Sequence, residues 1–78
     1  MTPSQIRGAR GMLGMTQAEL AAAAGMSTTA LNNIERGAAD PKASTLVAIQ
    51  KALEAAGVVF VAENGHGPGV RLRKRSDD

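Results

Sequence analysis

Residues 17–36, QAELAAAAGMSTTALNNIER, decide the fold of this 78-residue chain. The stretch predicts two short helices that are joined by a tight turn. Leu20, Ala21 and Ala24 recur at helical spacing and form one apolar stripe on the first helix. Gly25 is expected to end that helix, because glycine adopts the left-handed backbone of a helix C-terminus at little steric cost.

The second helix of this stretch is expected at residues 28–36, with Ser27 as its cap. Leu31 and Ile34 lie three positions apart, so they share the face that packs back on the first helix. The start of the first helix is marked too, because residues 16–19 (TQAE) match a capping box. Two capped helices around a glycine turn indicate a helix-turn-helix, whose second helix lies in the major groove of DNA.

Two further helices flank this motif. A helix over residues 3–13 is predicted by three apolar residues at helical spacing, Ile6, Ala9 and Leu13. The motif follows, with its first helix at residues 17–24. The last predicted helix ends at Gly57, and we expect either Ser44 or Asp40 to cap its start. Its apolar stripe is Leu46, Ile49, Leu53 and Ala56.

The pattern changes after the last helix. Residues 58–62 (VVFVA) form a β-branched run, and residues 70–73 (VRLR) alternate between apolar and basic side chains. A glycine-rich segment separates them at residues 63–69, so the sequence predicts a hairpin. The expected fold class is mainly α, with four to five helices and an appended C-terminal β-strand or hairpin. We divide the chain into a helical domain, residues 1–57, and an extension, residues 58–78.

The hairpin raises the question of a partner. An isolated hairpin is marginal in water, so it must pack on the helices or pair with another chain. Apolar side chains lie on both faces of the first strand, which favours a strand-mediated homodimer through Val59, Val61 and Leu72. The alternative is a hairpin that folds over its own core. The basic residues of the extension form a cluster: Arg71, Arg73, Lys74 and Arg75. The sequence leaves open whether this cluster contacts phosphates, takes part in a dimer or is simply solvated.

The composition excludes several classes of protein. The chain has no Cys, so it has no disulfide, thiolate zinc site or catalytic thiol. Phe60 is its one aromatic residue, which gives no platform for stacking single-stranded bases. His66 stands alone in a glycine-rich loop, so neither a catalytic triad nor a metal cage is expected. We therefore expect no enzyme and no cofactor. The sequence contains neither a membrane-length apolar run nor a secretory signal, which favours the cytoplasm.

The chain resembles the Xre/Cro family of phage-repressor-like DNA-binding domains. The resemblance runs from about residue 6 to residue 53 and rests on Arg7, Arg10, residues 15–21, residues 25–27, Leu31, residues 34–37, Pro41, residues 45–46 and residues 52–53. It implies a compact helical domain that binds double-stranded DNA. The extension after residue 57 lies outside the common family core.

The resemblance also implies roles for single residues. The positions that read bases are Thr28, Thr29 and Asn33. The positions at the DNA backbone are Gln17, Ser27 and Asn32, to which we add the basic residues Arg36 and Lys42. Asn33 can pair with adenine through two hydrogen bonds, and threonine methyls can touch a thymine methyl. Arg10 and Glu35 are expected to form an ion pair that links the first and third helices.

The sequence thus favours a transcriptional regulator, a repressor by preference, that binds an inverted-repeat operator as a homodimer. Two recognition helices about 34 Å apart would enter successive major grooves. The alternative is an antitoxin-like or anti-activator module whose strand and basic tail bind a protein partner. Changes on the surface of the third helix should impair a regulator, whereas changes at the strand should impair an adaptor.

Overall fold

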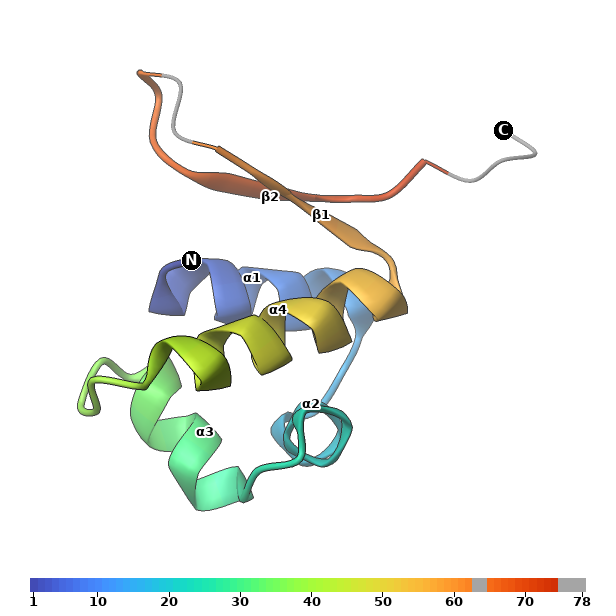
Figure 1. The fold of residues 1–78 in the computed structure, drawn as a ribbon. Helices are drawn as coiled ribbons and strands as arrows, with labels where there is room; N and C mark the ends of the chain where they lie inside the picture. Colours follow the sequence, from blue (N-terminus) through green and yellow to red (C-terminus); the bar gives the residue numbers. More distant parts are fainter. Residues whose placement is uncertain (63–64, 75–78) are drawn as a thin grey trace.

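The computed structural model of the chain describes residues 1–62 and 65–74. Four helices and a two-stranded hairpin make up this part (Figure 1). In chain order they are α1 (Pro3–Leu13), α2 (Gln17–Ala24), α3 (Thr28–Glu35), α4 (Ala43–Ala56), β1 (Val58–Val61) and β2 (Gly69–Leu72). The mainly helical fold with a C-terminal hairpin is confirmed. Two predicted features, the turn at residues 63–64 and the basic Arg75, lie outside the described residues.

The core lies where the helices meet. Its buried residues come from all four helices and from β1: Ile6, Ala9, Leu20, Ala21, Leu31, Ile34, Ile49, Leu53 and Val58. The apolar spacing in the sequence therefore identified the inward faces of α1, α2 and α3. The prediction was wrong at the end of α4, because Ala56 is exposed. It is the last residue of α4, one turn beyond the buried Leu53.

The turn of the helix-turn-helix has the expected backbone. Gly25 has a φ of 71°, in the left-handed region, and Met26 N–H donates to the carbonyl of Ala21 over 2.9 Å. The capping box at the start of α2 is also present: the Thr16 hydroxyl accepts from Glu19 N–H, and the Glu19 carboxylate accepts from Thr16 N–H. Such caps stabilise a helix by about 1 kcal/mol, so the start of α2 is fixed locally.

The start of α4 differs from the prediction. Neither Ser44 nor Asp40 caps this helix; its N-cap is Lys42, whose side chain makes no capping hydrogen bond. The Lys42 carbonyl already accepts from the amides of Thr45 and Leu46, at 3.0 and 3.1 Å. Ser44 therefore lies inside the first turn, too late to cap it. Asp40 precedes Pro41, which keeps it away from helical geometry.

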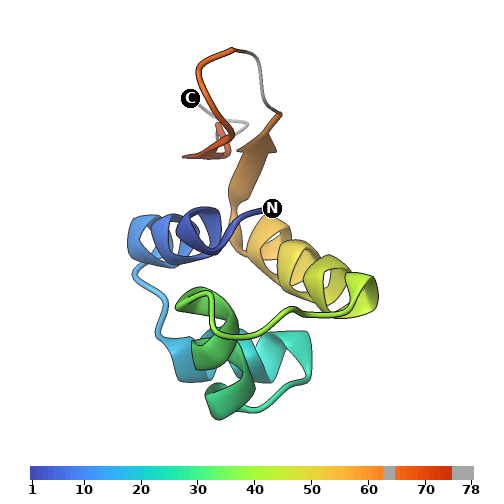
Figure 2. The same ribbon diagram turned by 90° about the vertical axis from the view of Figure 1, so that its left-hand side faces the viewer.

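The hairpin packs across α1 and α4, on the side of the helices opposite α3 (Figures 1 and 2). The two strands are antiparallel, with Val58 opposite Leu72 and Phe60 opposite Val70. Phe60 and Val70 lie against the core beside the buried Val58. One face of the hairpin thus covers the chain's own core, as the alternative interpretation of the sequence expected.

One buried side chain fastens the hairpin to α1. Gln5 is 7% exposed, and its Nε2 donates to the carbonyl of Gly69 over 2.8 Å. Its Oε1 accepts from Thr2 N–H, which completes a second capping box at the start of α1. The side-chain amide of Gln5 on α1 therefore bonds both to the N-terminal segment and to β2. None of the helices in the described part of the chain is long and apolar enough to cross a bilayer.

Candidate nucleic-acid interface

The outer face of α3 consists of short polar side chains. Thr28, Thr29 and Asn32 are exposed and Asn33 is half-buried, whereas Leu31 and Ile34 on the other face are in the core. The apolar residues thus orient the helix, and the polar residues are left at the surface. Ser27 caps α3, since its hydroxyl accepts from Ala30 N–H over 3.1 Å.

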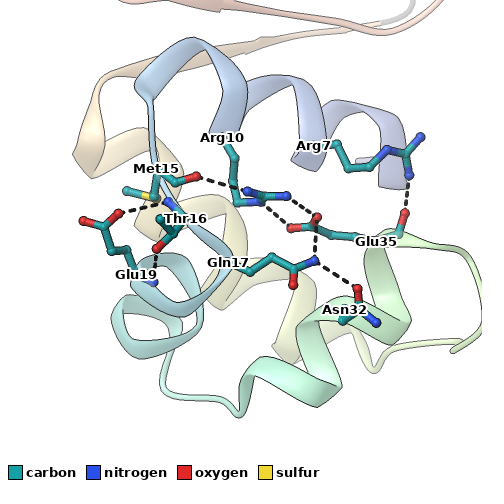
Figure 3. Close-up of polar contacts among 8 residues, drawn as sticks. All are labelled: Arg7, Arg10, Met15, Thr16, Gln17, Glu19, Asn32 and Glu35. Carbon is teal, nitrogen blue, oxygen red and sulfur yellow. Dashed lines mark hydrogen bonds and ion pairs between the residues drawn. The ribbon is translucent and has the colours of Figure 1, made fainter.

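A paired arginine and glutamate join α3 to α1 (Figure 3). Arg10 donates to Glu35 twice over 2.7 Å, from Nε to Oε2 and from Nη2 to Oε1. Its Nη1 also donates to the carbonyl of Met15 over 3.1 Å. The Glu35 side chain is only 3% exposed, so its charge depends on these donors. A forked guanidinium contact of this kind fixes direction as well as distance.

Gln17 extends this network to α2 and to the surface of α3. Its Nε2 donates to Oε1 of Glu35 and to Oδ1 of Asn32, each over 3.2 Å (Figure 3). Arg7, one turn before Arg10 on α1, donates to the backbone carbonyl of Glu35. Three helices therefore meet at one carboxylate, and this contact fixes the position of α3 relative to the start of α2.

The network shifts the pKa values of Glu35 and Arg10. Burial on its own raises the pKa of Glu35, but hydrogen bonds from Arg10 and Gln17 and the charges of Arg10 and Arg7 outweigh it and hold that pKa below its usual range. The hydrogen bond to Glu35 raises the pKa of Arg10. Both groups are therefore charged at neutral pH. At the start of α2, hydrogen bonds from Thr16 lower the pKa of Glu19.

A polar hollow of about 330 Å³ opens beside this network. It is lined by Arg7, Arg10, Gln17, Asn32, Glu35 and Arg36. Three guanidinium groups line it and one carboxylate offsets part of their charge. The start of α2 lies at its edge, where free backbone amides and the positive end of the helix dipole favour an anion. The hollow therefore has the charge and the size to receive a phosphate group.

The remaining predicted contact residues lie around α3. Arg36 follows the helix as its C-cap, and its Nε donates to Oδ1 of Asn33 over 3.2 Å. The prediction had placed Arg36 inside the helix, one residue too far. Lys42 is exposed at the start of α4. The sequence reading gave no role to Arg7, although its spacing of three from Arg10 is the signal that both share one face of α1.

The basic residues of the hairpin lie elsewhere. Arg71, Arg73 and Lys74 are exposed, and β2 lies on the opposite side of the helical layer from α3 (Figure 1). The structure therefore does not bring them together with the surface of α3. Within residues 1–62 and 65–74, no group of three or more His, Asp or Glu side chains is placed to hold a metal ion.

Comparisons with known proteins agree with this geometry. A family model described as helix-turn-helix matches residues 6–56, so the chain belongs to the helix-turn-helix family, of the Xre/Cro type. The fold is similar to the solution structure of the DNA-binding domain of the P22 C2 repressor, with a TM-score of 0.63. The two sequences are 35% identical over 67% of this chain and 68% of that chain. No curated protein matches the chain.

Proposed function

We propose that the chain is a DNA-binding transcriptional regulator that recognises a specific double-stranded sequence through α3. The observation that carries this proposal is the arginine-lined hollow beside the exposed polar face of α3. Protein–DNA complexes combine a surface that holds phosphates with side chains that read base edges. Both kinds of surface occur here side by side, since Asn32 of α3 also lines the hollow. The similarity to a repressor DNA-binding domain supports the same assignment.

The roles of single residues follow from their positions. Thr28, Thr29 and Asn33 would contact bases, since their side chains lie on the outer side of α3. Arg36 donates to Oδ1 of Asn33 and so orients its side-chain amide. The NH₂ group of Asn33 has no acceptor among the described residues. Asparagine offers a donor and an acceptor to adenine, so Asn33 is the side chain of α3 that can best distinguish one base pair from another.

A second set would bind the DNA backbone: Gln17, Ser27, Asn32, Arg36 and Lys42. Gln17 and Arg36 line the hollow, and Lys42 is exposed at the start of α4. These contacts set the register of α3 on the duplex and make the affinity depend on salt. The short side chains of α3 offer no guanine-reading arginine, so DNA shape should supply part of the specificity.

We further propose that the regulator is a repressor that binds an inverted repeat as a homodimer. A single small domain with one short recognition helix reads few base pairs. A two-fold dimer doubles the contacts and matches a symmetric operator. The adaptor alternative is less favoured, because the hairpin's inner face already packs on α1 and α4.

Footprinting of the DNA upstream of the gene, at two salt concentrations, tests the proposal. We expect a protected site with two-fold symmetry that persists at the higher salt concentration while non-specific binding is lost. Binding without sequence preference, lost uniformly as salt rises, would contradict it and favour the adaptor.

A further inference from the structure

The outer edge of β1 presents backbone groups that pair with no other strand among the described residues. Arg73 N–H donates to the Gly57 carbonyl over 2.7 Å just beyond the strands, so these two residues form a hydrogen-bonded pair. In an antiparallel ladder such pairs alternate with non-hydrogen-bonded ones. The pairs of Val58 with Leu72 and of Phe60 with Val70 are therefore non-hydrogen-bonded, and their amides and carbonyls point outward. Among the described residues, no backbone group bonds to the outward groups of Phe60.

The two edges of the hairpin differ in how well they could pair with a strand of another chain. The β2 edge is preceded by Pro68, which has no N–H, and it carries Arg71 and Arg73. Two copies that met along β2 would bring these like charges together. Residues 57–62 carry no charged side chain. Charge and backbone donors thus favour self-association along β1 and oppose it along β2.

The faces of the hairpin also favour a second copy of this chain. Val59 and Val61 point away from the helices, and each is half-buried. Leu72 lies opposite Val58, so it belongs to the other face, and the three residues predicted for dimerisation do not form one surface. Beside the end of β1 lies a hollow of about 310 Å³, lined by Phe60, Val61, Ala62 and side chains of α1 and α4. The helical side of the sheet is therefore not filled at this end of β1.

We infer that two copies join through their β1 edges into a four-stranded antiparallel sheet in the order β2, β1, β1, β2. Phe60 would face Phe60 of the second copy as a hydrogen-bonded pair. Each Val59 would then face Val61 of the other copy, which gathers four valines on the outer face of the sheet. The backbone bonds supply affinity, and the valines set the register.

The geometry of this sheet fits the proposed function, on which the inference rests. A two-fold axis that relates identical antiparallel strands is normal to the sheet, so both helical layers lie on the same side. Because α3 lies across the helical layer from the hairpin (Figures 1 and 2), both copies of α3 would face the same way. That arrangement suits two half-sites on one face of a duplex.

Disulfide cross-linking tests the register, because the chain has no Cys of its own. The double variant Val59→Cys/Val61→Cys places thiols at facing positions, about 4.5 Å apart between Cα atoms, within the range of a disulfide. Mild oxidation without DNA should link most of this variant into dimers. Val61→Cys alone and Leu72→Cys are the controls and should cross-link at least about tenfold less, since their Cα atoms would lie more than about 7 Å apart.

Sedimentation of the unmodified chain over a wide range of concentrations is the second measurement. We expect a monomer–dimer equilibrium whose dissociation constant rises about tenfold or more in Val61→Glu, which removes a valine from each side. A chain that stays monomeric, or Leu72→Cys cross-linking as well as the double variant, would overturn the inference. Sequence-specific binding by a monomer would contradict this inference and the proposed homodimer, and it would leave DNA recognition by α3 intact. A β1-linked dimer that binds DNA without sequence preference would contradict the proposed function alone.

Discussion

The Arg10 guanidinium holds the Glu35 carboxylate by two hydrogen bonds of 2.7 Å each, and this contact joins α1 to α3. Glu35→Ala leaves the Arg10 charge beside the core without its partner. We expect it to destabilise the fold by about 3–5 kcal/mol, measured by urea unfolding monitored by circular dichroism. Lys51→Ala, at an exposed position of α4, is the control and should change stability little. Equal stability of the two variants would show that the pair is not structural.

The lowered pKa of Glu35 makes stability depend on pH. Its folded-state pKa lies below the unfolded value of about 4.3, so the ionised carboxylate stabilises the fold fully above that pH. This contribution is lost as pH falls through the lower, folded-state pKa. Thermal melts of the parent should therefore decline steeply in acid, whereas Glu35→Gln should decline less. Parallel curves for the two proteins would contradict the assignment.

Gln5 is expected to hold the hairpin on α1. Gln5→Ala removes the donor to Gly69 and half of the capping box at the start of α1, and it leaves the half-buried Gly69 carbonyl without its partner. We expect a loss of about 1–3 kcal/mol and faster amide exchange in β1 and β2. Gln50→Ala is a matched control on α4, since Gln50 bonds to Glu54 and lines the same hollow as Gln5. Equal exchange rates in both variants would rule out this role for Gln5.

A substitution at the N-cap of α4 is expected to raise the stability of the fold and to weaken DNA binding. Lys42 occupies a position where serine would accept a bond from a free backbone amide. Lys42→Ser should stabilise the fold by about 1 kcal/mol and raise the melting temperature by about 4–8 °C. It should also weaken DNA binding at every sequence and flatten the salt slope by about one unit, if Lys42 binds a phosphate. Lys51→Ser is the control, and an unchanged salt slope in Lys42→Ser would remove Lys42 from the interface.

The helices could be predicted from the sequence because their signals are local. Thr16 and Glu19 mark the start of α2, Gly25 marks its end, and the spacing of Leu31 and Ile34 orients α3. Each signal depends on neighbours within one or two turns. The start of α4 was missed because several polar residues precede it and only the backbone at Lys42 decides between them.

Long-range contacts were harder to infer. The bond from Gln5 to Gly69 joins residues 64 positions apart, and no spacing rule links them. The hairpin could be predicted, but which face covers the core depends on pairing register. That register placed Leu72 on the opposite face from Val59 and Val61. The ion pair of Arg10 with Glu35 was expected only through family resemblance, since the residues lie on different helices.

The measurement that tests the central claim most directly compares two asparagine variants on α3. Asn33 is placed to read a base and Asn32 to meet the DNA backbone, one position apart on the same helix. The quantity is the ratio of affinities for the footprinted site and for a scrambled duplex, at one fixed salt concentration. We predict that Asn33→Ala lowers this ratio, by an amount that corresponds to a loss of about 1–3 kcal/mol in discrimination between the two duplexes. Asn32→Ala should lower both affinities and leave the ratio unchanged. An unchanged ratio in Asn33→Ala would contradict sequence reading by this residue of α3.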